Sequence, residues 1–221
     1  MSWVRKSAVL FLGLFLYAVG ILLTIHANLG VAPWDAFHLG IVEHSALTLG
    51  QTSQLVGFFI VILCAVLGET PGWGTLANMY FIGLFIDIIE RFGLIGSPGS
   101  LLARSIMLMV GILMMGWATY FYLSAGLGSG PRDGLMLALS RRLKMKVAIP
   151  RTAIEVTVLV IGYFLGGPLG IGTLLTAFLV GPAIQLAYSI MRQDPREVKH
   201  RTLVDDYHLV VRFRKEVREA K

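Results

Sequence analysis

The chain contains the same nine-residue motif twice, at an offset of 98 residues. Residues 27–35 read Ala-Asn-Leu-Gly-Val-Ala-Pro-Trp-Asp and residues 125–133 read Ala-Gly-Leu-Gly-Ser-Gly-Pro-Arg-Asp, so five of the nine positions are identical. A second block, Leu-Gly followed by Gly-x-Gly-Thr-Leu, recurs at the same offset in residues 67–76 and 165–174. Two motifs in one order at one spacing predict that the chain consists of two copies of a single unit.

The composition predicts that both copies lie in a lipid bilayer. Mean hydropathy is +0.74. Of the 221 residues, 56% are hydrophobic and only 14% are charged, which is too few to cover a soluble domain. The net charge of +6 does not indicate nucleic-acid binding, because the basic residues lie in predicted loops and the tail, where membrane topology places them. The single cysteine, Cys64, lies in an apolar run that favours packing over reactivity, and we expect no cofactor.

The predicted fold is all-α, with six apolar stretches near the length that crosses a bilayer. The predicted spans are about 7–25, 52–68, 75–92, 102–123, 151–166 and 173–191. The first has a basic start like that of a signal peptide, but it is long and lacks a cleavage site, so we interpret it as uncleaved. The Pro98-Gly99 turn separates the copies. The expected organisation is a first membrane repeat (1–97), a second (98–191) and a basic tail (192–221).

The basic residues predict how the spans are oriented. Loop 124–151 contains six Lys or Arg residues, whereas its counterpart, loop 26–52, contains none. Basic short loops stay in the cytoplasm, so the two loops should lie on opposite sides, with both termini cytoplasmic. Three spans per copy would then invert the second copy relative to the first. Inverted repeats are typical of secondary transporters, in which the two repeats alternate in conformation around a central site.

Each nine-residue motif predicts a break followed by a short helix. A glycine ends the span, a proline suits the first helical turn, and an aspartate lies in that turn near the positive end of the helix dipole. These residues are Gly30, Pro33 and Asp35 in the first copy and Gly128, Pro131 and Asp133 in the second. The helices, about 33–44 and 131–143, are too short to span, so they should dip into the bilayer or lie at its interface. The two aspartates are candidates for binding a solute, a cation or a proton, and ordinary helix capping is the alternative.

The Gly-x-Gly-Thr blocks lie between predicted spans. We favour a structural role, with the glycines making tight turns and close helix contacts and the threonines capping the next span. Backbone groups lining a solute site are the alternative. A phosphate loop is excluded because the Lys-Ser/Thr ending is missing. The residues are Gly72, Gly74, Thr75, Gly170, Gly172 and Thr173.

Polar side chains inside spans are costly and therefore mark candidate solute or ion sites. The candidates are Asp87, Glu155, Asn78, Gln54 and Gln185. Asp87 has a plainer interpretation as a residue near the outer interface, and Glu155 could simply pair with Arg151 four residues earlier. Three histidines in loop 26–52 do not form a convincing metal site. No nucleophile or metalloprotease motif is present, so we expect no enzymatic activity.

Taken together, Leu-Gly-x-x-Pro-Trp-Asp, Pro-Gly-x-Gly-Thr, Gly-Leu-Phe-Ile-Asp and Gly-Leu-Gly-Ser-Gly-Pro-Arg-Asp-Gly resemble the bacterial YczE/YitT-type membrane protein family, more closely its YczE branch. The resemblance covers about residues 7–191 and implies a multi-span protein of the bacterial plasma membrane. It implies no reaction.

Two functions fit these observations. The first is a permease or facilitator for a small polar or charged solute, working by alternating access around a midplane site. The second is an accessory or regulatory membrane protein that acts through its cytoplasmic loop and tail. The tail, 192–221, carries nine basic and six acidic residues, which suits an anionic lipid surface or a cytoplasmic protein partner equally.

Overall fold

The computed structural model describes residues 3–194, 198 and 200–205, and the long elements in those ranges are helices. They are α1 (Trp3–His26), α2 (Pro33–Glu43), α3 (Leu49–Val66), α4 (Trp73–Arg91), α5 (Leu101–Ser124), α6 (Pro131–Leu143), α7 (Ala148–Phe164) and α8 (Ile171–Ile190). Each helix of the second half begins 98 or 99 residues after its counterpart in the first. The predicted all-α class and the two short helices after α1 and α5 are therefore present.

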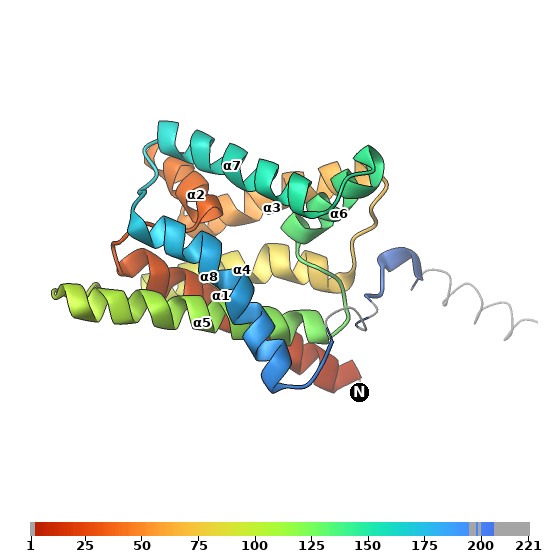
Figure 1. Ribbon diagram of the computed structural model, residues 1–221, viewed down its shortest axis with the longest axis horizontal. Helices are drawn as coiled ribbons and strands as arrows, with labels where there is room; N and C mark the ends of the chain where they lie inside the picture. The colour runs from red at the N-terminus through yellow and green to blue at the C-terminus, as the bar shows by residue number, and fades with distance from the viewer. Residues whose placement is uncertain (1–2, 195–197, 199, 206–221) are drawn as a thin grey trace, which may run out of the picture.

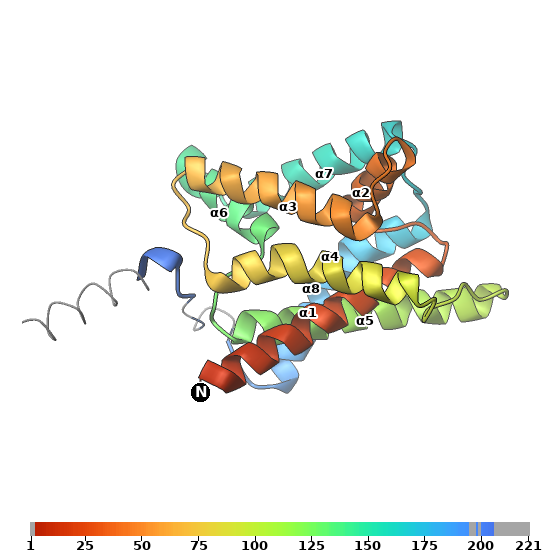
Figure 2. The same cartoon turned by 180° about the vertical axis from the view of Figure 1, so that it is seen from behind.

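The helices form two layers, which Figures 1 and 2 show from opposite sides. One layer contains α1, α4, α5 and α8, and the other contains α2, α3, α6 and α7. Within the first layer α1 packs along α5, and these two helices hold α4 and α8. Within the second layer α2 packs on α7 and α3 on α6. Each layer thus takes two helices from each half of the chain, so neither half forms a separate body.

Small residues allow the closest helix contacts. A Cβ atom on Gly13 of α1 would meet the backbone nitrogen of Tyr122 at 2.6 Å, and one on Gly20 would meet the Met115 side chain at 2.7 Å. Close approach through glycine is how helices pack in a membrane, where lipid removes the hydrophobic drive to associate. The largest buried cluster lies along the same helices and includes the fully buried Leu14 and Leu22.

Large apolar side chains cover the outside of the two layers. Phe58, Phe59 and Phe178, for example, are between 49% and 74% exposed, which suits contact with lipid tails. In the described part of the chain, four helices are long and apolar enough to cross a membrane: α1, α3, α5 and α8. Helix α7 has only 17 residues, and the end of α4 carries Asp87, Glu90 and Arg91. The predicted set of six inverted spans is thus supported in part and otherwise stays a prediction.

Two backbone hydrogen bonds join the halves reciprocally. The Gly74 N–H donates to the Leu127 carbonyl at 2.7 Å, and the Gly172 N–H donates to the Leu29 carbonyl at 2.6 Å. Each residue of the second bond lies 98 positions from the matching residue of the first. The same pair of motifs therefore meets twice, with the roles of the halves exchanged, as in an interface with two-fold symmetry.

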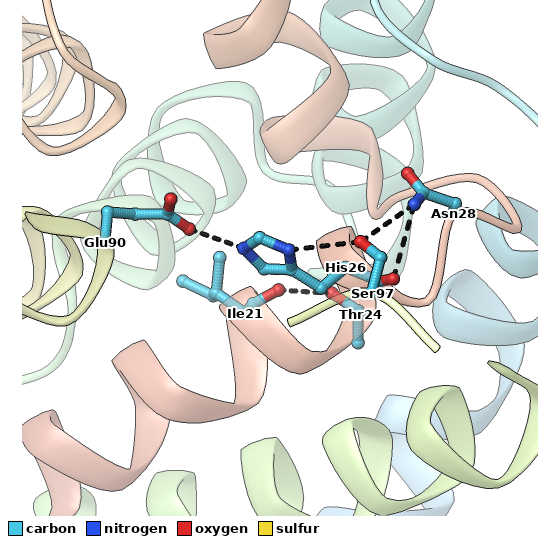
Figure 3. Close-up of polar contacts among 6 residues, drawn as sticks. All are labelled: Ile21, Thr24, His26, Asn28, Glu90 and Ser97. Carbon is cyan, nitrogen blue, oxygen red and sulfur yellow. Dashed lines mark hydrogen bonds and ion pairs between the residues drawn. The ribbon is translucent and has the colours of Figure 1, made fainter. Parts of the chain in front are cut away.

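Polar contacts join the end of α1 to the segment between the halves (Figure 3). His26 lies between Glu90 at 2.7 Å and Ser97 at 3.3 Å, and the Asn28 amide donates to the Ser97 hydroxyl at 3.0 Å. The Arg104 side chain of α5 donates to the carbonyls of Ala27 and Asn28. The two Arg104 bonds satisfy carbonyls of the turn that follows α1.

Part of the tail lies against the loop that follows α3 and the loop that follows α5. The Arg201 N–H donates to the Gly126 carbonyl, and the Leu203 N–H donates to the Pro71 carbonyl, both at 3.0 Å. Most of the tail, including the segment for which we predicted a lipid or protein contact, lies outside the described residues.

Candidate functional site

A cavity of about 330 Å³ lies between the two layers and takes its lining from both halves of the chain. This volume is in the range of small-molecule sites. Of the predicted site residues, four line it: Asp35, Asn78, Asp133 and Glu155. They come from α2, α4, α6 and α7, so the fold brings together side chains that are far apart in the sequence.

The short helices α2 and α6 point their N-termini at this cavity. Each begins with a proline after an extended residue, Ala32 or Gly130, and neither start has a side-chain cap. These residues and the following turn line the cavity. Proline suits the first position because its missing N–H would have no helical partner there. The free backbone groups and the dipole of both helices are therefore directed at one space.

Asp35 and His38 are deeply buried polar side chains of the cavity, each with 2% of its surface exposed. They are three residues apart on α2 and therefore share a face. Within the described residues, Asp35 Oδ2 and His38 Nε2 have no hydrogen-bond partner. A buried polar atom without a partner costs free energy, so a group that enters the cavity and bonds to these atoms would be held there.

Trp34 and Arg132 occupy matching positions in the two motifs and meet across the cavity. The Arg132 guanidinium carbon lies 4.6 Å from the centroid of a Trp34 ring, which is a cation–π contact. The next residue, Asp133, accepts a hydrogen bond from the Tyr122 hydroxyl at 3.2 Å. The same motif position therefore carries an aromatic ring in one half and a cation in the other.

Arg151 and Glu155 form a pair one turn apart on α7, with Nε and Oε1 at 3.2 Å. The pairing proposed as the plainer role of Glu155 is therefore present, yet both residues also line the cavity. Asn78 of α4 lies opposite, close to Gly130 at the start of α6.

Asp87, Gln54 and Gln185 lie outside the cavity lining. Asp87 accepts hydrogen bonds from the Thr48 hydroxyl at 2.6 Å and the Gly50 N–H at 2.9 Å, so it binds the start of α3. The Gln54 amide donates to the Tyr80 carbonyl at 2.9 Å. Both residues thus join α3 to α4, and Gln185 is exposed on α8. A solute-binding role for these three residues stays a prediction.

The Gly-x-Gly-Thr blocks make the expected turns, but the N-cap residues are Gly72 and Gly170, and Thr75 and Thr173 lie inside the first turns of α4 and α8. Thr75 Oγ1 accepts from the Gly72 N–H and Thr173 Oγ1 accepts from the Gly170 N–H, both at 3.2 Å. A Cβ atom on Gly72 would meet the Leu127 carbonyl at 2.4 Å, and one on Gly172 would meet the Gly30 carbonyl at the same distance. Gly30 and Gly128 have φ of 97° and 134°, which side chains rarely adopt. These blocks are fold-determining contacts between the halves.

The sequence did not single out Trp34, His38 or Arg132 as one site. The available signal was position, because His38 follows Asp35 by one turn and Arg132 is the counterpart of Trp34 at the 98-residue offset.

Comparison with known proteins places the chain in a family. A family of unknown function, DUF6198, matches residues 4–189. The chain belongs to this family. The chain is 40% identical to the "uncharacterized membrane protein YczE" of Bacillus subtilis over 175 residues, covering 77% of this chain and 80% of that protein. The predicted resemblance to the YczE branch is confirmed, and with it a location in a bacterial membrane.

Two further relatives are similar over most of their length. An uncharacterized protein of Haemophilus influenzae is 32% identical over 191 residues, covering 86% of this chain and 87% of that protein. The uncharacterized protein YyaS of Bacillus subtilis is 29% identical over 187 residues, covering 82% and 92% respectively. No solved structure matches the chain.

Proposed function

We propose that this DUF6198 protein is a permease for a small polar or charged solute, which it binds in the cavity between the layers. In this proposal the chain has six spans in two inverted repeats, 1–97 and 98–191, and both termini are cytoplasmic. The repeated motifs, the reciprocal contacts between halves and the shared cavity support this arrangement. Charged residues inside a membrane domain are expensive to keep, and they are expected where a solute passes.

The observation that carries the proposal is that matching helix pairs differ in packing. Helix α3 packs against α4, whereas their counterparts α7 and α8 stand apart (Figures 1 and 2). Residues of both α7 and α8 line the cavity. A Cβ atom on Gly83 of α4 would meet the Gly50 carbonyl at 2.4 Å, but one on the matching Gly181 of α8 would meet nothing within 4 Å. Two copies of one unit in two arrangements are what alternating access requires, because exchanging the arrangements moves the opening to the other side.

The basic loop indicates which side is open. The cavity lining from α7 consists of Arg151 and Glu155 in its first turns, next to the loop rich in Lys and Arg. That loop belongs in the cytoplasm by the positive-inside rule. The open side between α7 and α8 would then face the cytoplasm, with α3 and α4 closing the outer side.

Transport is tested with the full chain purified and reconstituted into proteoliposomes. The vesicles are given a pool of isotope-labelled small polar metabolites, and their contents are read by mass spectrometry. We expect at least one compound to enter only when protein is present. Entry of none, together with no shift in melting temperature in the same pool, would refute the permease and favour an accessory protein acting through loop and tail.

The inverted arrangement has its own test. Tags inserted near residues 46 and 146, in the linkers before α3 and α7, should be reached from opposite sides of sealed membrane vesicles. Labelling of both tags from one side would refute the inversion.

A further inference from the structure

Among the described residues, two opposite charges that face the cavity form no ion pair with each other or with any other group. Asp35 Oδ2 has no hydrogen-bond partner, and Arg132 forms its contact with the Trp34 ring but no ion pair, within the ranges that the structure describes. The other charged groups of the cavity are partnered, since Arg151 pairs with Glu155 and Asp133 bonds to Tyr122. Asp35 and Arg132 are thus the two ionic groups that remain available for a ligand.

Their chemistry differs in a way that fits one kind of molecule. A carboxylate buried to 2% exposure is costly unless a cation or several donors reach it, and a protonated amine supplies both. A guanidinium that stacks on an aromatic ring keeps its N–H edge free to bind a carboxylate in a bidentate way. His38 Nε2, one turn from Asp35, offers a second partner at the same end of the cavity.

We propose that the cavity binds a small zwitterion, with its ammonium group at Asp35 and His38 and its carboxylate at Arg132. This inference rests on the proposed permease, because it names the class of solute for the same site. The cavity lining also includes the apolar side chains of Ile60, Ile82 and Val180, which suit a short carbon skeleton. Since Asp35 comes from one half of the chain and Arg132 from the other, such a ligand bridges the two halves.

A matched set of four probes tests the class. Norvaline and δ-aminovalerate are zwitterions. The two charges are close together in norvaline and far apart in δ-aminovalerate. Both become butylamine when the carboxylate is removed, and both become valerate when the amine is removed. Binding to the purified full chain is measured by isothermal titration at moderate ionic strength. We expect at least one zwitterion to bind with a Kd lower by about ten-fold or more than that of either single-charge probe.

Substitutions assign each end of the ligand. Asp35→Asn should weaken the binding of the preferred zwitterion and of butylamine. Arg132→Gln should weaken the binding of the zwitterion and of valerate. Glu43→Gln on α2 and Arg142→Gln on α6 are matched controls, because both residues are exposed outside the cavity. Far-UV circular dichroism and melting temperature check that every variant is folded.

The outcomes separate this inference from the proposed function. Equal affinity for a zwitterion and a single-charge probe, no binding of any probe, or loss of binding in the control variants would overturn the zwitterion site. If the zwitterion binds selectively but does not enter proteoliposomes, the site stands and the permease is wrong. If single-charge metabolites enter instead, the permease stands and the zwitterion class is wrong.

Discussion

The two halves of the molecule share motifs and helix order, but they differ where α3 meets α4 and where α7 faces α8. In the first half, Asp87 binds the start of α3, and Gly83 lies against the Gly50 backbone. In the second half, the matching residues are Gln185 and Gly181, and neither holds α7. Both halves have a glycine at this position, but only Gly83 makes a close helix contact. The halves therefore differ in how their helices are placed.

We call α7 and α8 the open pair, because they do not pack against each other as α3 and α4 do. The side-chain sizes on the open pair would allow the two helices to pack together. Gly57 of α3 faces Met79 of α4, where a Cβ atom would lie 2.9 Å from the Met79 Cγ. At the same positions the second half has Glu155 and Ala177, so the large and the small partner are exchanged. Pro182, next to Gly181, interrupts the hydrogen bonds of α8 and provides a place where this helix can bend.

The largest effect is expected when α7 and α8 are cross-linked to each other, so that the difference between the halves is removed. In a Cys64→Ser background, cysteines replace Thr152 of α7 and Phe178 of α8, the counterparts of the bonded Gln54 and Tyr80. A short bis-methanethiosulfonate reagent should join them only when α7 approaches α8. Metabolite uptake should then stop completely and return on reduction. Uptake that continues after full cross-linking would show that α7 and α8 need not separate.

The two matching glycines should respond in opposite ways. Gly83→Ala places a Cβ atom 2.4 Å from the Gly50 carbonyl and should lower the free energy of unfolding by about 1–3 kcal/mol. Gly181→Ala meets nothing within 4 Å and should leave that free energy unchanged or raise it by up to about 1 kcal/mol. If α8 closes as α4 does, Gly181→Ala should nevertheless slow uptake by about ten-fold, the equivalent of about 1.4 kcal/mol.

Denaturant unfolding in detergent and proteoliposome uptake measure these two effects separately. A Gly181→Ala variant with normal uptake would indicate that this glycine is not part of a closing surface.

The short helices of the motifs could be predicted from the sequence, because their boundaries depend on nearby residues. Predicted helix 131–143 matches α6, and predicted helix 33–44 ends one residue after α2, since proline and glycine mark such boundaries whatever the surroundings. The starts of α1, α3 and α7 were placed three or four residues too late. The predicted span at 52–68 missed the cap formed by Thr48, whose side chain accepts from the Gln51 N–H.

The candidate site could be predicted only in part. A polar residue inside a span needs a hydrogen-bond or ionic partner, but the sequence does not say which group supplies it. Asp35 and Asp87 therefore looked alike, although one faces the cavity and the other binds the backbone of α3. The contact between Trp34 and Arg132 depends on how the two halves meet, which hydropathy does not encode. The 98-residue offset was the signal available, because Trp34 and Arg132 occupy the same position of the repeated motif.

A smaller effect is expected at the bond between Asp87 and α3. Asp87→Asn keeps the shape but loses the charge that strengthens the bonds to Thr48 and Gly50, so the free energy of unfolding should fall by about 1 kcal/mol. Gln185→Asn at the matching, exposed position is the control and should change it by less than about 0.5 kcal/mol. Hydrogen exchange should become faster at the Gly50 amide in Asp87→Asn alone. Equal effects of the two substitutions would argue against Asp87 as the contact that distinguishes the halves.

The matching threonines sharpen the comparison at a second contact. Thr75 Oγ1 accepts from the Gly72 N–H and also donates to the Ser129 carbonyl at 2.6 Å, whereas Thr173 Oγ1 accepts from the Gly170 N–H without a second bond of that kind among the described residues. Thr75→Val should therefore cost about 1–2 kcal/mol of unfolding free energy and Thr173→Val about 0.5–1 kcal/mol, since one loses two bonds and the other loses one. Valine keeps the volume of the side chain, so the difference isolates the bond to Ser129. That bond joins the start of α4 to the loop before α6, and an equal cost at both positions would mean that it contributes nothing to holding the halves together.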